Sequence, residues 1–241
     1  MRLDGFLSKN GFGSRKSVKK LILNKRVKVN SEVILDVGYK IIDGDVITVD
    51  GNVIKDISNI VLMINKPEGY ISSLIDERYP SVMNLIPDVY RKTLRLVGRL
   101  DYDTTGLLLI TDNGILNQRL TSPKYHVSKT YEVKVNHLLK NELIEKFNQP
   151  NDIGKGEITK PAKLEIVDDY NALITITEGK YHEIKRLFGK YNYDVIKLNR
   201  ISFGPLFLND LPLGKYRELT KDEYIILLKE VNLNEEDFIW V

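Results

Sequence analysis

Cysteine is absent from this chain of 241 residues, which excludes a disulfide framework, a thiolate zinc site and a cysteine nucleophile. No apolar run approaches the roughly 20 residues that span a bilayer, and the first residues lack the apolar stretch of a signal peptide. Histidine is rare, with only the scattered His126, His137 and His182, and neither a phosphate loop nor a dinucleotide fingerprint occurs. These absences predict a cytoplasmic protein that uses no metal and no cofactor.

Net charge is small over the whole chain but uneven along it. The 36 basic and 33 acidic residues leave a net charge of +3. Residues 1–30 alone carry +8, because they hold nine lysines and arginines and a single acid, Asp4, so the remaining residues together carry −5. Strongly basic first 30 residues followed by a slightly acidic remainder indicate a polyanionic partner. Nucleic acid is the first candidate for that partner, and no membrane partner is expected.

The distribution of apolar residues divides the chain in two, with a linker expected over 51–60. Before it, the pattern predicts a small module with a helix around Leu3–Leu7, a second helix over about 15–24, and short strands at 27–29 and 46–49. After it, the predicted strands are 61–64, 94–97, 107–111, 129–135, 162–167, 172–177 and 194–201, and the predicted helices are 113–121, 138–147, 182–190 and 221–230. Because strands outnumber helices and do not alternate with them regularly, the expected fold class is α+β with a mixed or antiparallel sheet.

The second helix of the first module is expected to have two unlike faces. Ser14 is a plausible N-cap. At 100° per residue, Val18, Leu21 and Ile22 share one side, whereas Lys16, Lys19 and Lys20 gather on the other. Such lysines commonly form a solvated face, but the surrounding positive charge favours a face that contacts phosphates.

The densest polar signal is the block from Gly98 to Gly114, a polar loop between two apolar strands. Arg99, Asp101 and Asp103 fall within five residues of one another. Loops held by a rigid sheet are where reactive groups usually lie. The alternative is a tight turn in which the two aspartates accept backbone N–H groups and Thr104 and Thr105 cap them.

Two further segments hold residues suited to chemistry on nucleic acid. In the predicted helix near 182–190, the spacing places Ile184, Leu187, Phe188 and Tyr191 on a buried face and His182, Lys185 and Arg186 together on the other. A cation from that second face could pair with Asp101 and keep it ionised, or the face could be an ordinary basic surface. Tyr131, in a predicted strand, could stack on an unpaired base or belong to the core.

In chain order these segments resemble one family, the bacterial ribosomal RNA pseudouridine synthases, and above all its small-subunit (16S) members. The resemblance covers nearly the whole chain, and the Gly-Arg-Leu-Asp-x-x-Thr-x-Gly-Leu-Leu string is highly specific to the family. The matching blocks are Met1–Asp4, Leu62–Tyr70, Gly98–Gly114, Thr121–Pro123, Lys129–Tyr131, Thr159–Ala162 and Glu178–Phe188. The resemblance implies an S4-like RNA-binding domain over 1–58 and a catalytic domain over 59–241, built on a mixed, mostly antiparallel sheet with flanking helices.

The resemblance also implies roles for individual residues. Asp101 occupies the position of the catalytic aspartate, Lys185 that of its basic partner, and Tyr131 that of the tyrosine that packs on the target uracil. Arg99 matches the side chain that fills the gap left by an everted nucleotide. Further RNA contacts are expected from Leu100, Thr104, His182 and Arg186, and, in the first domain, from Arg2, Arg15, Lys16, Lys19, Lys20 and Arg26. The reaction is an isomerisation, which needs no cofactor.

The substrate is inferred from the pair His182 and Lys185, because large-subunit relatives tend to have arginine at both places. The resemblance therefore implies a monomer that modifies a uridine of small-subunit ribosomal RNA, of the uridine-516 type. Two departures from the family are Glu183, where glutamine is usual, and Lys180, where arginine is common. The first adds negative charge beside the expected site. The alternatives are an enzyme for large-subunit (23S) RNA and a non-catalytic S4-type RNA-binding or ribosome-assembly factor.

Overall fold

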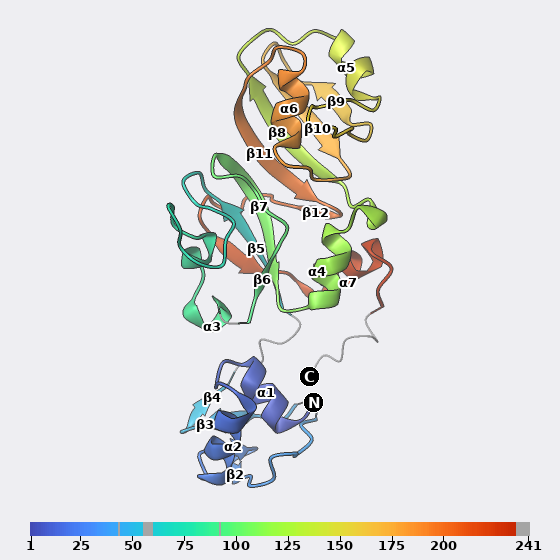
Figure 1. Cartoon of the computed structure of the whole chain (residues 1–241). Helices are drawn as coiled ribbons and strands as arrows, with labels where there is room; N and C mark the ends of the chain where they lie inside the picture. The colour runs from blue at the N-terminus through green and yellow to red at the C-terminus, as the bar shows by residue number, and fades with distance from the viewer. Residues whose placement is uncertain (43, 55–59, 92, 235–241) are drawn as a thin grey trace.

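The computed structural model describes residues 1–42, 44–54, 60–91 and 93–234 (Figure 1). Three hydrophobic cores are present, one drawn only from residues 1–54 and two only from residues 60–234. Each core thus draws on one of two stretches of the chain, which are named the first unit (residues 1–54) and the second unit (residues 60–234). The expected boundary at residue 58 lies outside the described residues.

The first unit packs two short helices on a small antiparallel sheet. Its elements are α1 (Leu3–Lys9), α2 (Arg15–Leu23), β1 (Val27–Val29), β2 (Glu32–Val33), β3 (Ile47–Val49) and β4 (Asn52–Val53), with strand order β2-β1-β3-β4. Ser14 caps α2 by accepting a hydrogen bond from the backbone N–H of Ser17. The two expected faces of α2 are confirmed, since Val18 and Ile22 are buried and the three lysines are exposed.

The expected linker over 51–60 is wrong at its start. Asn52 and Val53 form β4, which pairs with Thr48 and Val49 of β3. Gly51 sits between these strands at φ +83°, in the left-handed region that suits glycine, and so forms the hairpin turn. Residues 55–59 lie outside the described part of the chain.

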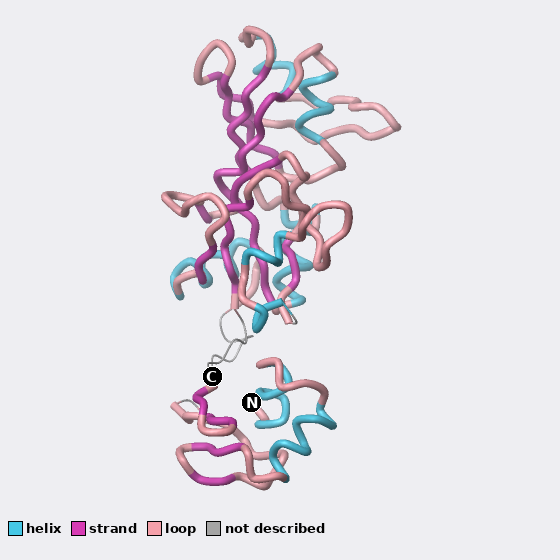
Figure 2. Tube along the Cα trace, turned by 90° about the vertical axis from the view of Figure 1, so that its left-hand side faces the viewer, coloured by secondary structure: helices cyan, strands magenta, loops and turns pink. Residues whose placement is uncertain are grey.

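The second unit is built on one nine-stranded sheet, in which seven strands follow the order β13-β5-β7-β11-β8-β10-β9, while β6 also pairs with β7 and β12 with β11. Its strands are β5 (Val61–Lys66), β6 (Arg95–Val97), β7 (Thr104–Thr111), β8 (Lys129–Val135), β9 (Lys163–Ile166), β10 (Asn171–Ile176), β11 (Val195–Phe203), β12 (Leu206–Phe207) and β13 (Tyr216–Glu218). Among the described strands of this sheet, β7 and β11 are the pair that runs parallel and the others pair antiparallel, which confirms the expected mixed, mostly antiparallel sheet. Figure 2 shows these strands as a continuous band along the unit.

Helices cover both faces of this sheet. They are α3 (Asp88–Arg91), α4 (Gly114–Thr121), α5 (Glu142–Phe147), α6 (Glu183–Gly189) and α7 (Lys221–Glu230), with short 3-10 turns at Val82–Leu85 and Pro123–Tyr125. Helices α5 and α6 lie against the β8–β10 end, and α4 and α7 lie beside β5 and β7 (Figure 1). Among the described helices, none has the length and apolar character that crossing a membrane requires.

The two cores alternate along the central strands. In β7, Leu108 and Ile110 face the core under α6, whereas Leu107 and Leu109 face the core under α4 and α7. This period of two is the reason that the sequence shows a continuous apolar run there, as expected for a strand buried on both faces. The buried β7 holds the loop before it, and with it the polar block from residue 98, in a fixed place.

Two element predictions differ from the structure by more than two residues at one end. The helix expected from residue 138 begins at Glu142, because residues 138–140 form a loop and the backbone N–H of Leu139 pairs with Asp169 instead. The strand expected from residue 107 begins at Thr104, because three polar or small residues there pair in parallel with β11. Both differences come from tertiary pairing that local pattern does not encode.

Candidate active site

One pocket collects most of the residues that the sequence singled out in the second unit, although Arg186 does not line it. The loop between β6 and β7, the strands β8, β10 and β11, and the start of α6 surround it. The expected site residues in its wall are Arg99, Leu100, Asp101, Thr104, Tyr131, His182 and Lys185. The parallel pairing of β7 with β11 and the antiparallel pairing of β11 with β8 bring these segments together.

The Asp101 carboxylate is partly exposed and faces two basic groups. Lys185 Nζ lies 3.4 Å from Asp101 Oδ2, and His182 Nε2 lies 3.6 Å from Asp101 Oδ1. The pairing that the helix spacing suggested for a cation near residue 185 is therefore present. A cation at this distance favours the ionised form of a carboxylate.

The tight turn that was the alternative for this loop forms through its backbone. The N–H of Thr104 donates to the carbonyl oxygen of Asp101 at 3.1 Å. The expected threonine caps do not form, because the Thr105 hydroxyl donates instead to Asn199 Oδ1 at 2.9 Å. The turn leaves the Asp101 carboxylate on the pocket side, so the two interpretations of the loop are compatible.

Asp103 is a site partner that sequence reasoning did not select. Lys185 Nζ donates to Asp103 Oδ1 at 2.5 Å, a shorter contact than the one with Asp101. Burial acts to raise the pKa of Asp103, but the hydrogen bond and positive charge of Lys185 outweigh it and hold the pKa below its ordinary value. The sequence feature that could have indicated this partner is the presence of a second acidic residue, Asp103, two positions after Asp101.

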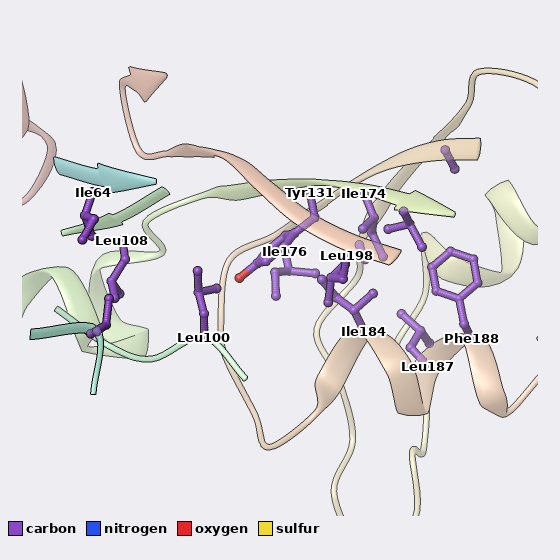
Figure 3. Packing of buried hydrophobic residues seen from close by; sticks show 14 of the residues in the cluster. Ile64, Leu100, Leu108, Tyr131, Ile174, Ile176, Ile184, Leu187, Phe188 and Leu198 are labelled. Carbon is purple, nitrogen blue, oxygen red and sulfur yellow. The ribbon is translucent and has the colours of Figure 1, made fainter. Parts of the chain in front are cut away.

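Tyr131 is both a core residue and a pocket residue. Its side chain is buried among Ile176, Ile184 and Leu198 (Figure 3), and it also lines the pocket. Its hydroxyl lies 3.4 Å from Nη1 of Arg200. The two alternatives for this tyrosine are thus satisfied together, because the pocket floor is part of the core.

Arg200 is buried beneath the site and was not found from the sequence. Its Nε donates to the carbonyl oxygen of Leu107 at 2.6 Å, and its guanidinium lies 5.9 Å from the centre of the Tyr131 ring. Gly106 makes this close approach of the strands β7 and β11 feasible, since a Cβ there would lie 2.3 Å from the Arg200 carbonyl oxygen. The available signal was a lone arginine inside an apolar strand.

Lys66 is fully buried behind the loop between β6 and β7. Its Nζ donates to the carbonyl oxygens of Pro67 at 3.0 Å, Tyr102 at 3.4 Å and Thr104 at 2.8 Å. Burial lowers the pKa of Lys66 to about 8, against the opposing pull of the nearby acids. The Lys66 ammonium therefore binds the backbone carbonyl groups on both sides of Asp103 and stabilises the conformation of the loop. The sequence motif contained Lys66 without indicating this role.

Arg186 does not share a face with His182 and Lys185, so that expectation is wrong. Its guanidinium turns to the loop 153–157, where it pairs with Glu157 and donates to the carbonyl oxygens of Ile153 and Gly154. The residue before α6 has left-handed backbone at φ 50°, so His182 lies outside the helical register that the spacing assumed. Tyr191 is likewise beyond the end of α6 and only half-buried.

Glu183 changes the expected electrostatics of the site. Its side chain is buried, and its Oε2 accepts a hydrogen bond from the backbone N–H of Lys180 at 2.7 Å. Burial, with the neighbouring charge of Glu178, raises the pKa of Glu183 to about 7. Glu178 keeps its charge through an ion pair with Lys180 and a 2.6 Å hydrogen bond from the Lys160 N–H. The negative charge expected from Glu183 is therefore largely removed below neutral pH.

The candidate contacts in the first unit divide into two groups. Arg2 pairs with Asp4 at 3.0 Å, and Arg26 pairs with Asp50. Both pairs are on the surface, where such contacts contribute little to stability and can be exchanged for a phosphate. The others, Arg15, Lys16, Lys19 and Lys20, are exposed on α2. In the described part of the chain, no group of three acidic or histidine side chains is arranged to hold a metal ion.

Comparisons with known proteins agree in both units. Residues 60–190 match the family model described as RNA pseudouridylate synthase, and residues 1–47 match the S4 domain. The chain is 37% identical to the ribosomal small subunit pseudouridine synthase A of Yersinia pestis, over 92% of this chain and 96% of that protein. It is 38% identical to an uncharacterized RNA pseudouridine synthase of Aquifex aeolicus, over 98% of this chain and 100% of that protein. A solved structure titled as a pseudouridylate synthase superposes with a TM-score of 0.68 at 36% identity, covering 94% of this chain and 99% of that one.

Proposed function

Because the chain belongs to the RNA pseudouridylate synthase family, we propose that it isomerises a uridine of small-subunit ribosomal RNA with Asp101 as the catalytic carboxylate. The observation that carries this proposal is the position of Asp101. Its partly exposed carboxylate lies in a pocket between the Lys185 ammonium and the His182 imidazole. The relatives named for the small ribosomal subunit support the choice of RNA.

The chemistry explains why this arrangement suits the reaction. Pseudouridine formation breaks the N1–C1′ bond of uridine, turns the base and joins C5 to C1′. Breaking the bond builds positive charge at C1′, which a nearby carboxylate stabilises by its charge or by adding to the sugar. Asp101 can serve in either way, or by removing a proton from the ribose. The Lys185 ammonium, 3.4 Å from Asp101 Oδ2, is the counter-ion of this carboxylate.

The remaining residues of the pocket receive the base. The target must leave the helical stack, at a cost of a few kcal/mol. Stacking on Tyr131 returns roughly 1–3 kcal/mol. Arg99, two residues before Asp101, fills the vacated space, while His182 and the backbone near Leu100 border the ribose side. The Thr104 hydroxyl is buried without a hydrogen-bond partner in the described residues, and we assign it to a polar edge of the uracil.

The first unit supplies affinity for the RNA backbone. We propose the division at residue 58, with the S4 match and the separate core of residues 1–54 as support. The exposed lysines of α2, together with Arg15, form its phosphate-binding face, and Arg2 and Arg26 exchange their surface ion pairs for phosphates. The protein acts as a monomer in the cytoplasm, where ribosomal RNA is its substrate.

Mapping of pseudouridine tests the proposal directly. Ribosomal RNA from cells with and without this protein is mapped, and purified protein is incubated with small-subunit RNA and with small-subunit particles. We expect one protein-dependent pseudouridine in the small-subunit RNA, at the position corresponding to uridine 516. Product confined to large-subunit RNA would assign the chain to the 23S enzymes, and binding without product in any RNA would assign it to assembly factors.

A further inference from the structure

A second hollow lies directly beside the candidate active site and shares Arg99, Leu100 and Asp101 with it. Its volume is about 240 Å³, smaller than the roughly 300–1,000 Å³ of pockets that hold drug-sized ligands. The rest of its wall comes from residues 71–73, Glu77, Tyr102 and Tyr181. The reaction described above uses only the first pocket, so this hollow has no role in it.

Two exposed aromatic rings line this hollow. Among the aromatic residues that the structure describes, four are exposed, namely Tyr102 at 38%, Tyr170 at 42%, Tyr181 at 62% and Phe207 at 58%. Tyr102 and Tyr181 come from loops 79 residues apart in the chain, yet both border the same hollow. Aromatic rings held open to solvent beside a nucleic-acid site are the surfaces on which unpaired bases stack.

Both rings are held in place by their neighbours. The Tyr102 ring packs on Tyr79 at a centroid distance of 4.0 Å. The Tyr181 ring stacks on His182 at 3.8 Å with an interplanar angle of 17°, and its carbonyl oxygen accepts a 3.0 Å hydrogen bond from Arg186. Arg186, which turns away from the catalytic pocket, thus fixes the backbone of Tyr181. Such preorganisation reduces the entropy lost when a ligand binds.

The charges in the wall favour a base over a phosphate. Glu77 and Asp101 both border the hollow, and two carboxylates repel a phosphate group. The N–H groups on the edge of a nucleobase can instead donate to a carboxylate. Arg99 is the cation in the wall and is shared with the catalytic pocket. The hollow therefore combines stacking surfaces with hydrogen-bond acceptors.

We propose that this hollow binds the unpaired base of a nucleotide next to the target uridine, with Tyr102 and Tyr181 as its stacking surfaces. The identity of the target rests on the proposed function. Tyr181 stacks on His182, whose Nε2 lies 3.6 Å from Asp101, so a base placed there extends a stack that ends at the catalytic carboxylate. The subsite selects RNA in which the target and its neighbour are both unpaired.

Kinetics of tyrosine variants test the subsite from the protein side. Tyr102→Ala and Tyr181→Ala are compared with Tyr170→Ala, which removes an equally exposed ring outside the hollow. We expect kcat/KM on small-subunit RNA to fall by about 5- to 150-fold for each of the first two, the range that corresponds to the loss of roughly 1–3 kcal/mol of stacking. Tyr170→Ala should match the wild type. Tyr181→Phe should retain most of the activity, because it keeps the ring.

Substrates with a missing base test the subsite from the RNA side. An abasic nucleotide is placed on one side or the other of the uridine that mapping identifies. For one of the two positions, the abasic substrate should reduce kcat/KM of the wild type, and it should reduce kcat/KM of Tyr181→Ala by a smaller factor, because only the contact with Tyr102 is then left to lose. Equal losses in the wild type and Tyr181→Ala, or no loss at either position, overturn the subsite.

A binding measurement that needs no turnover separates this inference from the proposed function. A single-stranded hexanucleotide that carries 2-aminopurine beside a uridine is titrated with the full chain. Stacking should quench its fluorescence with the wild type and Tyr170→Ala, but much less with Tyr102→Ala and Tyr181→Ala. Equal quenching by all four proteins overturns the subsite even if pseudouridine forms. Tyrosine-dependent quenching without pseudouridine in any RNA supports the subsite and overturns the function.

Discussion

Lys185 donates a hydrogen bond from Nζ to Oδ1 of Asp103 at 2.5 Å, across 82 positions of the chain. The same ammonium lies 3.4 Å from Asp101, so one cation serves two carboxylates in one loop. Of the two, Asp101 borders the pocket of the candidate active site and Asp103 is not part of its wall. Asp103 therefore positions the Lys185 side chain through a hydrogen bond, and the positive charge of Lys185 then lies beside the Asp101 carboxylate.

This sharing predicts unequal effects of two substitutions. Lys185→Met leaves two carboxylates together without their cation, and we expect kcat to fall about 10²- to 10³-fold, as for the loss of one preorganised electrostatic group. Asp103→Asn keeps the cation beside Asp101 and should change kcat by less than about 10-fold. Single-turnover rates on small-subunit RNA provide the comparison, with Lys185→Arg as the charge-retaining control. An Asp103→Asn loss as large as that of Lys185→Met would mean that Asp103 itself takes part in the chemistry.

Asp101→Asn should remove turnover and leave RNA binding within about twofold. The amide cannot stabilise charge at C1′ or add to the sugar, whereas the partly exposed position of Asp101 makes it unimportant for packing. Pseudouridine formation and a filter-binding titration are measured on the same preparation, with thermal unfolding as a check of the fold. Equal turnover by the variant would falsify the catalytic assignment.

The raised pKa of Glu183 predicts that the free energy of unfolding depends on pH. Its pKa is raised from 4.5 to about 7 in the folded chain, so the folded state binds more protons than the unfolded state between these values. Stability from this group is therefore complete below pH 4.5 and declines as pH rises to about 7, by on the order of 3 kcal/mol. Glu178, whose pKa is lowered, acts in the acidic range below this window.

Glu183→Gln removes that titration while keeping the side-chain shape and the hydrogen bond from the Lys180 N–H. Urea unfolding at pH 5 and pH 8 should show the wild type losing stability relative to the variant as pH rises. Glu132→Gln is a suitable control, because Glu132 is an exposed glutamate on β8. A constant difference between the wild type and Glu183→Gln at both pH values contradicts the prediction.

The lysine face of α2 should control the salt dependence of RNA binding. Each phosphate contact contributes about 0.7–0.9 to the slope of log K against log salt. Replacing Lys16, Lys19 and Lys20 by glutamine should therefore reduce the slope by roughly 2. The triple replacement of Lys134, Lys163 and Lys197, exposed lysines of the sheet in the second unit, changes the net charge equally and should leave the slope nearly unchanged. Identical slopes for the two triple variants would remove the RNA-binding role from α2.

Gly106→Ala should destabilise the second unit by several kcal/mol. The new Cβ would lie 2.3 Å from the Arg200 carbonyl oxygen, and the backbone at φ +105° is strained for any other residue. Gly114→Ala is the matched control, because nothing lies within 4 Å of that position and it is in the first turn of α4. Alanine there should be neutral or stabilising. Chemical unfolding of both variants measures the difference.

The sequence was most informative where the cause is local. The lysine and apolar faces of α2, the cap at Ser14 and the strand over Lys129–Val135 all follow from spacing, because side-chain direction in a helix or strand is set by backbone geometry. The polar block from Gly98 to Gly114 also identified the family, and the comparisons confirmed it. Short strands such as β12 and β13 carry too little pattern to be found in this way.

Tertiary structure alone decided how the site is assembled. The contact of Lys185 with two aspartates, the turning of Arg186 toward loop 153–157 and the position of Arg200 under Tyr131 depend on which strands pair. No local period encodes that pairing. The nearly neutral Glu183 has the same origin, since its pKa is set by burial, and burial exists only after the chain has folded. The amino-acid order therefore determined which residues are present for the chemistry, and packing determined which of them meet.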